Sequence, residues 1–236
     1  MTVLSNIKML YIVQFLIGFL LADFGGGIFH WFEDNYLSYC SDMPLLGSIA
    51  KDNEMHHYYP RLVLRYPWWI SMSTTLPLLV VLSTVFYFTV SRKQFKKYKV
   101  LILTFLLFGT VGNVLHRFGH MRDSETNNVV KLLQKIGVLQ THHYHSVHHK
   151  TSDRRFCVVS QYLNPFLDYV HFWRGLELVV FWITGVKAKP KNTYDEYESI
   201  QTKAHAKAKS IRPPIVTKKE VSELECNLKE YMHCNE

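Results

Sequence analysis

The chain has 236 residues, a formal net charge of +8 and thirteen histidines. This length suits one domain, or one domain with a tail, and the charge favours an acidic partner such as nucleic acid or an anionic membrane surface. Long apolar runs decide for the membrane and exclude nucleic acid as the expected partner. Four cysteines are scattered without a Cys-x-x-Cys pair, so we expect reduced thiols and no zinc ribbon: Cys40, Cys157, Cys226 and Cys234.

Three apolar stretches are predicted to cross the membrane as helices. The first runs from about Leu4 to Trp31, and a signal peptide is the alternative interpretation. The second, Tyr66 to Ser91, has no charged residue and no histidine, and Pro77 is expected to kink it. The third covers Val100 to Leu115. A bilayer core needs about 20 apolar residues of helix, so the second stretch is the clearest of the three.

The last third of the chain changes character. Phe156 to Val186 is apolar but interrupted by proline and charged residues, which favours a re-entrant or interfacial segment; a fourth full span is the alternative. Residues 187–236 are polar and are predicted to form a cytosolic tail. Thr217 and Glu220 have the spacing of a capping box, so a short amphipathic helix is expected there.

The order of spans and histidines predicts the architecture. Consecutive spans alternate in direction, so the end of the first span, the loop after it, the end of the third span and the tract "THHYHSVHHK" all reach the same side. We therefore expect an all-α integral membrane helical bundle over residues 1–186, with three to four spans and a histidine-rich cap on one membrane face. Eight histidines would meet in this cap: His30, His56, His57, His116, His120, His145, His148 and His149.

The spacing of these histidines favours a metal centre over a compositional accident. His116 and His120 are four residues apart and can share a helix face, as can His145, His148 and His149. A zinc site uses three or four protein ligands, so eight histidines suit two ions with open positions. Imidazole alone does not distinguish zinc, copper, iron and nickel.

Other residues near the boxes could support the site. Asp23, Asn113 and His143 are candidates for orienting the ligands, because a metal-bound histidine needs a partner on its other ring nitrogen. His142 and His171 are expected to stay outside the ligand set. Four arginines on the same side could pair with a lipid phosphate or anchor the interface: Arg117, Arg122, Arg154 and Arg155.

The motifs "ADFGGGIFHWFEDNY", "NEMHH", "HRFGH" and "HSVHH", in this order, resemble the Kua-like lipid desaturase family and, more widely, the integral-membrane di-iron desaturases and hydroxylases. The resemblance covers about Leu16 to Pro190. It implies two iron ions held by the eight histidines and a requirement for Asp34. It also implies O2 as co-substrate, a membrane phospholipid as substrate, and electrons from an external donor of cytochrome b5 or ferredoxin type.

The function expected from these features is an oxygen-dependent desaturase that places a carbon–carbon double bond in a fatty acyl or alkyl chain. A di-iron lipid hydroxylase is the first alternative, and a membrane metal-binding or transport protein the second. The few polar residues inside the spans argue against transport. We expect a multi-pass protein of the endoplasmic reticulum with a cytosolic histidine face, and a plastid-type membrane as the alternative.

Overall fold

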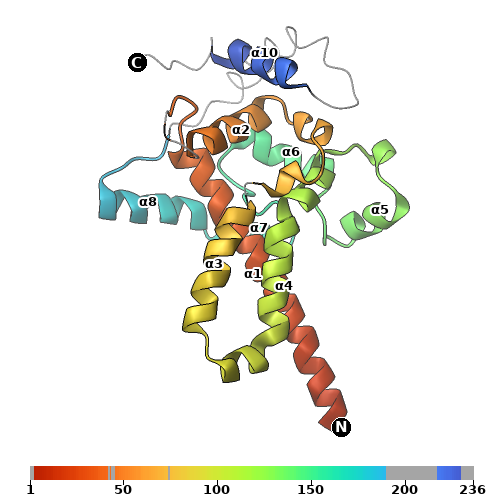
Figure 1. Cartoon of the computed structure of the whole chain (residues 1–236). Helices are drawn as coiled ribbons and strands as arrows, with labels where there is room; N and C mark the ends of the chain where they lie inside the picture. The colour runs from red at the N-terminus through yellow and green to blue at the C-terminus, as the bar shows by residue number, and fades with distance from the viewer. Residues whose placement is uncertain (1–2, 42, 44–45, 74, 190–216, 230–236) are drawn as a thin grey trace.

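The computed structural model describes residues 3–41, 43, 46–73, 75–189 and 217–229. Throughout these ranges the regular elements are helices and no strand occurs, which confirms the prediction of an all-α fold. Figure 1 shows two parts, a stalk of long helices and a cap of shorter ones. Two histidines expected to be bystanders, His205 and His233, lie outside the described residues.

The stalk consists of α1 (Val3–Tyr36), α3 (Thr75–Thr89) and α4 (Arg92–His116). The beginning of α1 and the turn between α3 and α4 lie at the same end of the stalk, away from the cap (Figure 1). Within the part of the chain that the structure describes, two stretches are long and apolar enough to cross a membrane, Ile7–Tyr36 and Arg92–His120. With 15 residues, α3 is about 22 Å long, which is shorter than a bilayer core of about 30 Å.

The second predicted span is wrong in its first part. The chain from Leu62 to Met72 forms the 3-10 turns η1 (Leu62–Arg65) and η2 (Ile70–Met72). Tyr66 is extended, with φ −75° and ψ 146°, because a residue before a proline is disfavoured in the α region. Pro77 lies in the first turn of α3, where its missing N–H interrupts no helical hydrogen bond. A proline at this position gives no cause for the kink that the sequence predicted.

The basic run after α3 is helical, and α4 begins eight residues before the predicted start of the third apolar stretch at Val100. Ser91 caps α4: its hydroxyl accepts from Gln94 N at 3.2 Å, and its own N–H donates to Gln94 Oε1 at 3.0 Å. The helix is interrupted at Tyr98, with φ −111° and ψ 19°. Gln14 of α1 donates to the carbonyl of Lys97 at 2.9 Å, so the carbonyl beside the interruption keeps a hydrogen-bond partner.

Two glycines let α1 approach its neighbours closely. A Cβ on Gly18 would lie 2.6 Å from the carbonyl oxygen of Leu101 and 2.9 Å from Cβ of Thr104. A Cβ on Gly27 would lie 2.8 Å from Sγ of Cys157. Side chains at these positions would push α4 and the segment after α6 away from α1.

The cap contains the shorter elements, and Figure 1 shows them gathered around the cap end of α1. Their bounds are α2 (Leu46–Tyr58), η3 (Arg117–His120), η4 (Asp123–Glu125), α5 (Asn128–Lys135), α6 (His142–Thr151), α7 (Asn164–Tyr169) and α8 (Phe172–Thr184).

The apolar segment from Phe156 to Val186 is divided and does not form a long helix. His171 breaks it between α7 and α8 with a left-handed backbone, φ 51°. The 13 residues of α8 extend about 20 Å, too short for a span. In Figure 1 α8 lies across the direction of the stalk, and Trp182 and Ile183 on it are 88% and 79% exposed. These features support the interfacial interpretation over a fourth span.

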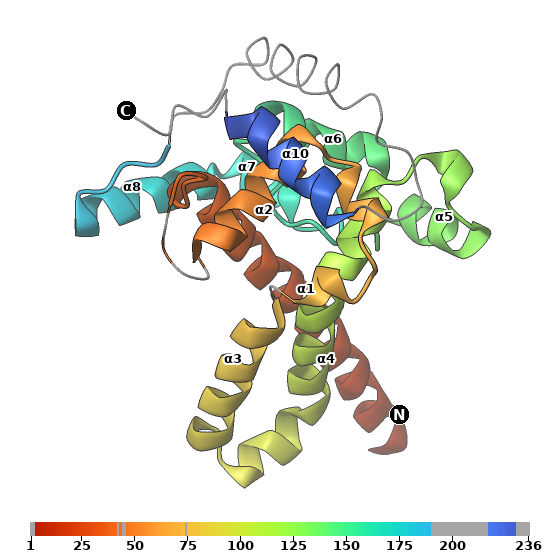
Figure 2. The same ribbon diagram turned by 45° about the horizontal axis from the view of Figure 1, so that its top comes forward.

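The predicted tail helix is α10 (Lys218–Lys229), and the capping box of Thr217 and Glu220 is present. Figure 2 shows α10 lying across the cap beside α2. Leu224 is 2% exposed and packs in a core cluster with Met55, Tyr59 and Leu62, among others. Arg65 Nη2 also lies 3.2 Å from Glu220 Oε1. The tail helix is therefore part of the cap, a position that its sequence does not reveal.

Replacing Leu224 by alanine is expected to loosen this contact, because truncating a buried leucine costs about 2–5 kcal/mol. The variant should melt at a lower temperature in detergent, and trypsin should cleave it faster at Lys218 and Lys219. Glu223→Ala is the matched control, since Glu223 is the exposed neighbour on the same helix. Equal melting temperatures for the two variants would contradict the packing of α10 on the cap.

Of the three cysteines within the described ranges, one differs from the expectation. Cys40 is disulfide-bonded, so the prediction of four reduced thiols is wrong there. Cys157 is a buried free thiol beside α1, and Cys226 is an exposed free thiol on α10.

Candidate metal centre

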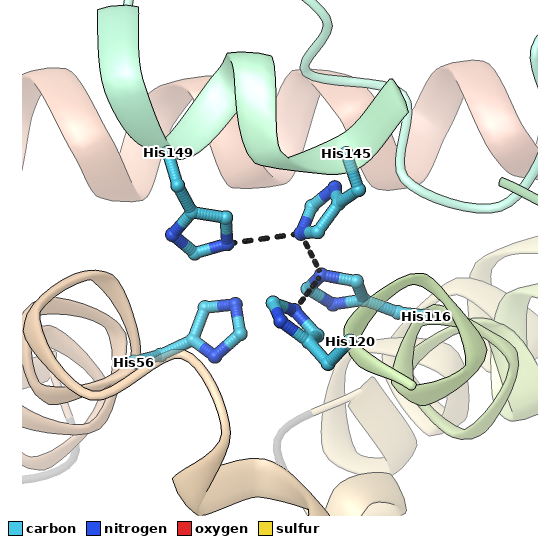
Figure 3. A group of neighbouring side chains, drawn as sticks. All are labelled: His56, His116, His120, His145 and His149. Carbon is cyan, nitrogen blue, oxygen red and sulfur yellow. Dashed lines mark hydrogen bonds between the residues drawn. The ribbon is translucent and has the colours of Figure 1, made fainter. Parts of the chain in front are cut away.

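The structure brings the eight predicted histidines together with Asp34 in the cap. They form two groups, and within each group the candidate ligand atoms lie within 4.8 Å of one another. The first group, drawn in Figure 3, contains His56, His116, His120, His145 and His149. The second contains His30, Asp34, His57 and His148.

Helical geometry divides the boxes between the groups. Consecutive side chains on a helix point about 100° apart, so the neighbours His56 and His57 at the end of α2 join different groups. His145 and His149 are four residues apart on α6 and join the same group, whereas His148 turns toward the other.

The first group has nitrogens at ligand spacing. The Nε2 atoms of His116 and His145 are 2.8 Å apart, those of His145 and His149 are 2.9 Å apart, and those of His116 and His120 are 3.0 Å apart. Two imidazole nitrogens bound at right angles to one ion, each about 2.1 Å from it, lie about 3.0 Å apart. The group therefore fits one metal ion.

The second group adds a carboxylate to three imidazoles. Nε2 of His30 lies 2.9 Å from Nε2 of His148. Asp34 lies close to two of the imidazoles. Its Oδ1 is 3.0 Å from Nε2 of His57, and its Oδ2 is 3.3 Å from Nε2 of His148. Nδ1 of His148 donates to the carbonyl of Arg154 at 2.8 Å. Its Nε2 therefore keeps the lone pair that would bind a metal.

The two groups adjoin, so they form one centre. The rings of His57 and His149, from different groups, have centroids 4.7 Å apart. His56 Nε2 is buried without a hydrogen-bond partner among the described residues, as expected of an atom reserved for a ligand. Together with the nitrogen-rich donor set, this geometry fits two metal ions; that the residues bind them stays a prediction.

Burial keeps four histidine side chains of the cap neutral, which is the form that binds metals. Desolvation lowers the pKa of His56, His145 and His149 well below the ordinary value, and neighbouring histidines lower it further. Desolvation also lowers the pKa of His148 to about 4. Neutral imidazole is the form that coordinates metals, so these side chains need to lose no proton on binding.

A cavity of about 210 Å³ lies beside the centre, and three of the histidines, His30, His56 and His116, form part of its wall. The remaining wall residues are both apolar and polar: Glu33, Ile49, Asp52, Asn53, Met55, Leu62, Val63, Tyr66, Ile70, Ser71, Ser73 and Asn113. A partly enclosed space next to the candidate ligands is where a substrate would meet bound metals.

The three predicted orienting residues have different places. Asn113 lines the cavity with His116. His143 is exposed on α6 and belongs to neither group. Asp23 is buried and accepts three hydrogen bonds, from Val159 N, Ser160 N and Ser160 Oγ. It thus ties α1 to the segment that follows α6.

Three of the four candidate lipid-binding arginines have partners within the chain. Arg117 donates to the carbonyls of Leu64 and Tyr66 and to Oγ of Ser71, which fixes the turns that border the cavity. Arg155 donates to the carbonyl of Tyr144 and stacks on its ring. Arg154 pairs with its exposed neighbour Asp153. Arg122 is exposed, and a contact with lipid phosphate stays a prediction for all four.

The structure adds four residues that the sequence did not single out. Glu33 Oε2 lies 3.6 Å from His30 Nδ1, and Asn53 Nδ2 donates to Asp34 Oδ1 at 2.7 Å. Gln140 Oε1 is 3.1 Å from His145 Nδ1, and Arg61 Nη1 donates to the carbonyl of His120 at 3.2 Å. Glu33 and Asn53 have helical spacing to a box histidine, which could have revealed them. Gln140 and Arg61 act across loops and carry no such signal.

The fold and the site define an all-helical protein with a two-group histidine centre at one end of long apolar helices. Residues 19–191 match the family model described as the lipid desaturase domain. The chain belongs to the lipid desaturase family and is an oxidoreductase of the desaturase class, which confirms the resemblance seen in the sequence.

Three relatives illustrate the range of the family. A probable fatty acid desaturase of Acanthamoeba polyphaga mimivirus is 30% identical over 80% of this chain and 90% of its own length. Fatty acid desaturase 4 of Arabidopsis thaliana, a chloroplastic protein, is 27% identical over 73% of this chain and 52% of its own. Plasmanylethanolamine desaturase 1 of Mus musculus is 27% identical over 76% of this chain and 68% of its own length. No solved structure matches the chain.

Proposed function

We propose that the chain is an oxygen-dependent di-iron desaturase of membrane lipids, which places a carbon–carbon double bond in a fatty acyl or alkyl chain of a phospholipid. The observation that carries the proposal is the cavity: its wall joins histidines of both groups, His30 and His56, to apolar side chains such as Met55 and Leu62. The relatives named for fatty acids and for plasmanylethanolamine support a lipid chain as substrate.

The electron balance of this reaction defines what the chain must provide. Two C–H bonds break and one C=C bond forms, which releases two electrons and two protons. One O2 takes up four electrons and four protons and leaves as two waters, so a donor must supply two electrons and the solvent two further protons. Two bound irons would supply the oxidising power that side chains lack. We propose a cytochrome b5-type or ferredoxin-type protein as the donor.

The chain's own residues would position the substrate. Met55, Leu62 and Val63 offer apolar contact for a hydrocarbon chain beside the ligands. Arg117 holds the bordering turns in place through two backbone carbonyls. Such contacts would hold the reacting carbon at a fixed position beside the metals, which lowers the entropic cost of the reaction. The apolar part of the wall would limit water near that carbon.

Comparative lipidomics of expressing and non-expressing cells tests the proposal. A desaturase yields a lipid that has lost two hydrogens, and the product identifies the head group, the chain and the bond position. A gain of one oxygen would establish the hydroxylase alternative instead. Altered cellular metal content without any lipid change would favour the metal-binding or transport alternative and overturn the desaturase.

We further propose a multi-pass membrane protein of the endoplasmic reticulum with the cap facing the cytosol, where a cytochrome b5-type donor would reach it. A plastid-type membrane with a ferredoxin-type donor is the alternative, and the chloroplastic relative supports it.

The exposed thiol of Cys226 allows a direct test of orientation. In sealed microsomes, a membrane-impermeant maleimide should label Cys226, and the buried Cys157 should stay unlabelled. Mass spectrometry should find the label on the peptide that contains Cys226, and Cys226→Ser should lack it. Labelling that requires permeabilisation would place the cap in the lumen, an outcome that the disulfide at Cys40 favours because the lumen is oxidising.

A further inference from the structure

The residue that fixes His145 is a buried amide outside the histidine boxes. Gln140 lies just before α6 and is 1% exposed. Its side-chain oxygen Oε1 lies 3.1 Å from Nδ1 of His145. On the other side of the same ring, Nε2 lies 2.8 Å and 2.9 Å from Nε2 of His116 and His149. Gln140 therefore contacts the back of the ring whose front faces the candidate metal position.

The hydrogen bonds of Gln140 determine which way its amide points. Nε2 of Gln140 donates to the carbonyls of Cys157 and Ser160, the latter at 2.9 Å. Carbonyls only accept, so the amide nitrogen must face them and the amide oxygen must face His145. An oxygen opposite Nδ1 requires the proton on Nδ1. The lone pair of His145 is then on Nε2, directed at the other ligands.

The amide itself has little freedom to move. The backbone N–H of Gln140 donates to the carbonyl of Val159 at 3.0 Å, and its carbonyl accepts from Gln134 Nε2 at 2.9 Å. Ser160, whose carbonyl binds the amide, is held by Asp23 of α1 through both its N–H and its hydroxyl. A continuous buried chain of hydrogen bonds thus runs from α1 to His145.

We propose that Gln140 is a positioning residue of the metal centre, which sets the tautomer and the ring orientation of His145 so that Nε2 is presented to the metal. The inference rests on the metal centre of the proposed function. Arg154 serves His148 in the same way, but through a backbone carbonyl that no side-chain substitution removes. At Gln140 the orienting oxygen belongs to a side chain, so its contribution is accessible to mutation.

The test uses the purified full-length chain, stripped of metal and titrated with Co²⁺, whose absorption bands report the ligand geometry. Gln140→Leu removes the acceptor and should weaken one of two bound Co²⁺ ions by about 10–100-fold, the usual cost of losing such a partner. Gln140→Asn keeps an amide that is too short to reach His145 and should behave alike. Gln140→Glu retains an oxygen at Nδ1 but turns a second oxygen toward the carbonyls of Cys157 and Ser160, so it should bind Co²⁺ more tightly than Gln140→Leu although it melts at a lower temperature than the wild type.

Gln14→Leu is the matched control for loss of structure. Gln14 is a buried amide of α1 that donates to the carbonyl of Lys97 and accepts from the N–H of Leu101 in the stalk, so it takes no part in holding Gln140. This variant should melt at a lower temperature, as Gln140→Leu does, yet bind Co²⁺ as the wild type does.

The outcomes separate the two proposals. Unchanged Co²⁺ affinity in Gln140→Leu and Gln140→Asn, or an equal loss in Gln14→Leu, would overturn the positioning role while two Co²⁺ ions in the wild type leave the metal centre standing. A wild-type chain that binds no Co²⁺ would overturn the metal centre itself, and the role of Gln140 with it.

Discussion

Replacing His148 by alanine is expected to reduce lipid desaturation by more than about 100-fold, which exceeds the usual cost of losing a residue that only orients a metal ligand. Nε2 of His148 lies 2.9 Å from Nε2 of His30 and 3.3 Å from Asp34 Oδ2. The substitution therefore deletes one of four members of the second group and leaves a space beside the others. The double-bond content of lipids from cells that express each variant measures the effect.

His143→Ala is the control for this substitution. His143 lies on the same helix, is exposed and belongs to neither group, so its loss should leave activity unchanged. Iron content per chain should fall from about two to about one in His148→Ala, because the first group remains complete. Normal desaturation in His148→Ala, at an expression level equal to the wild type, would remove the second group from the reaction.

Asp34→Asn is expected to have an effect of similar size although the side chain keeps its volume. The carboxylate faces three groups at once: the Nε2 atoms of His57 and His148, and the amide nitrogen of Asn53. An asparagine has a single oxygen and no charge, so its NH2 group must face one of these nitrogens. Facing Nε2 of His148, it would donate to the lone pair that would bind a metal. It also brings no negative charge to balance the positive charge of a bound metal.

Activity and iron content should both fall in Asp34→Asn, by about 10–100-fold or more for activity. Asp153→Asn is the matched control, since that carboxylate is exposed on the surface, pairs with Arg154 and belongs to neither histidine group. Full activity with two irons in Asp34→Asn would show that Asp34 shapes the fold of the cap and not the metal centre.

The histidine boxes were predictable because helical spacing is local. His116 and His120, or His145 and His149, are pairs of candidate ligands within five residues, and the alternation of apolar segments predicted every box at one end of the stalk. The same locality predicted α10, whose capping box lies within four residues. Segment composition also distinguished the short, interrupted α7 and α8 from a full span.

Hydropathy was a poorer guide to helix boundaries than to helix existence. It placed the second helix from Tyr66, but Pro67 and the turns after it delay α3 until Thr75. It also placed the start of the third helix at Val100, whereas a capping box at Ser91 begins α4 at Arg92. The basic residues before Val100 indicate contact with water, but a helix can begin in water as well as in lipid.

The sequence by itself determined the all-α class, the family and the identity of the clustered histidines, because these depend on residues close together in the chain. Only the tertiary structure decided how the histidines divide into two groups, since His30 and His148 are 118 residues apart. It also placed Leu224 in the cap and Gln140 behind His145. Leu224 packs on residues far away in the chain, and Gln140 is held by the carbonyls of Cys157 and Ser160. No helical spacing predicts such contacts, because they depend on packing and on the pairing of buried polar groups.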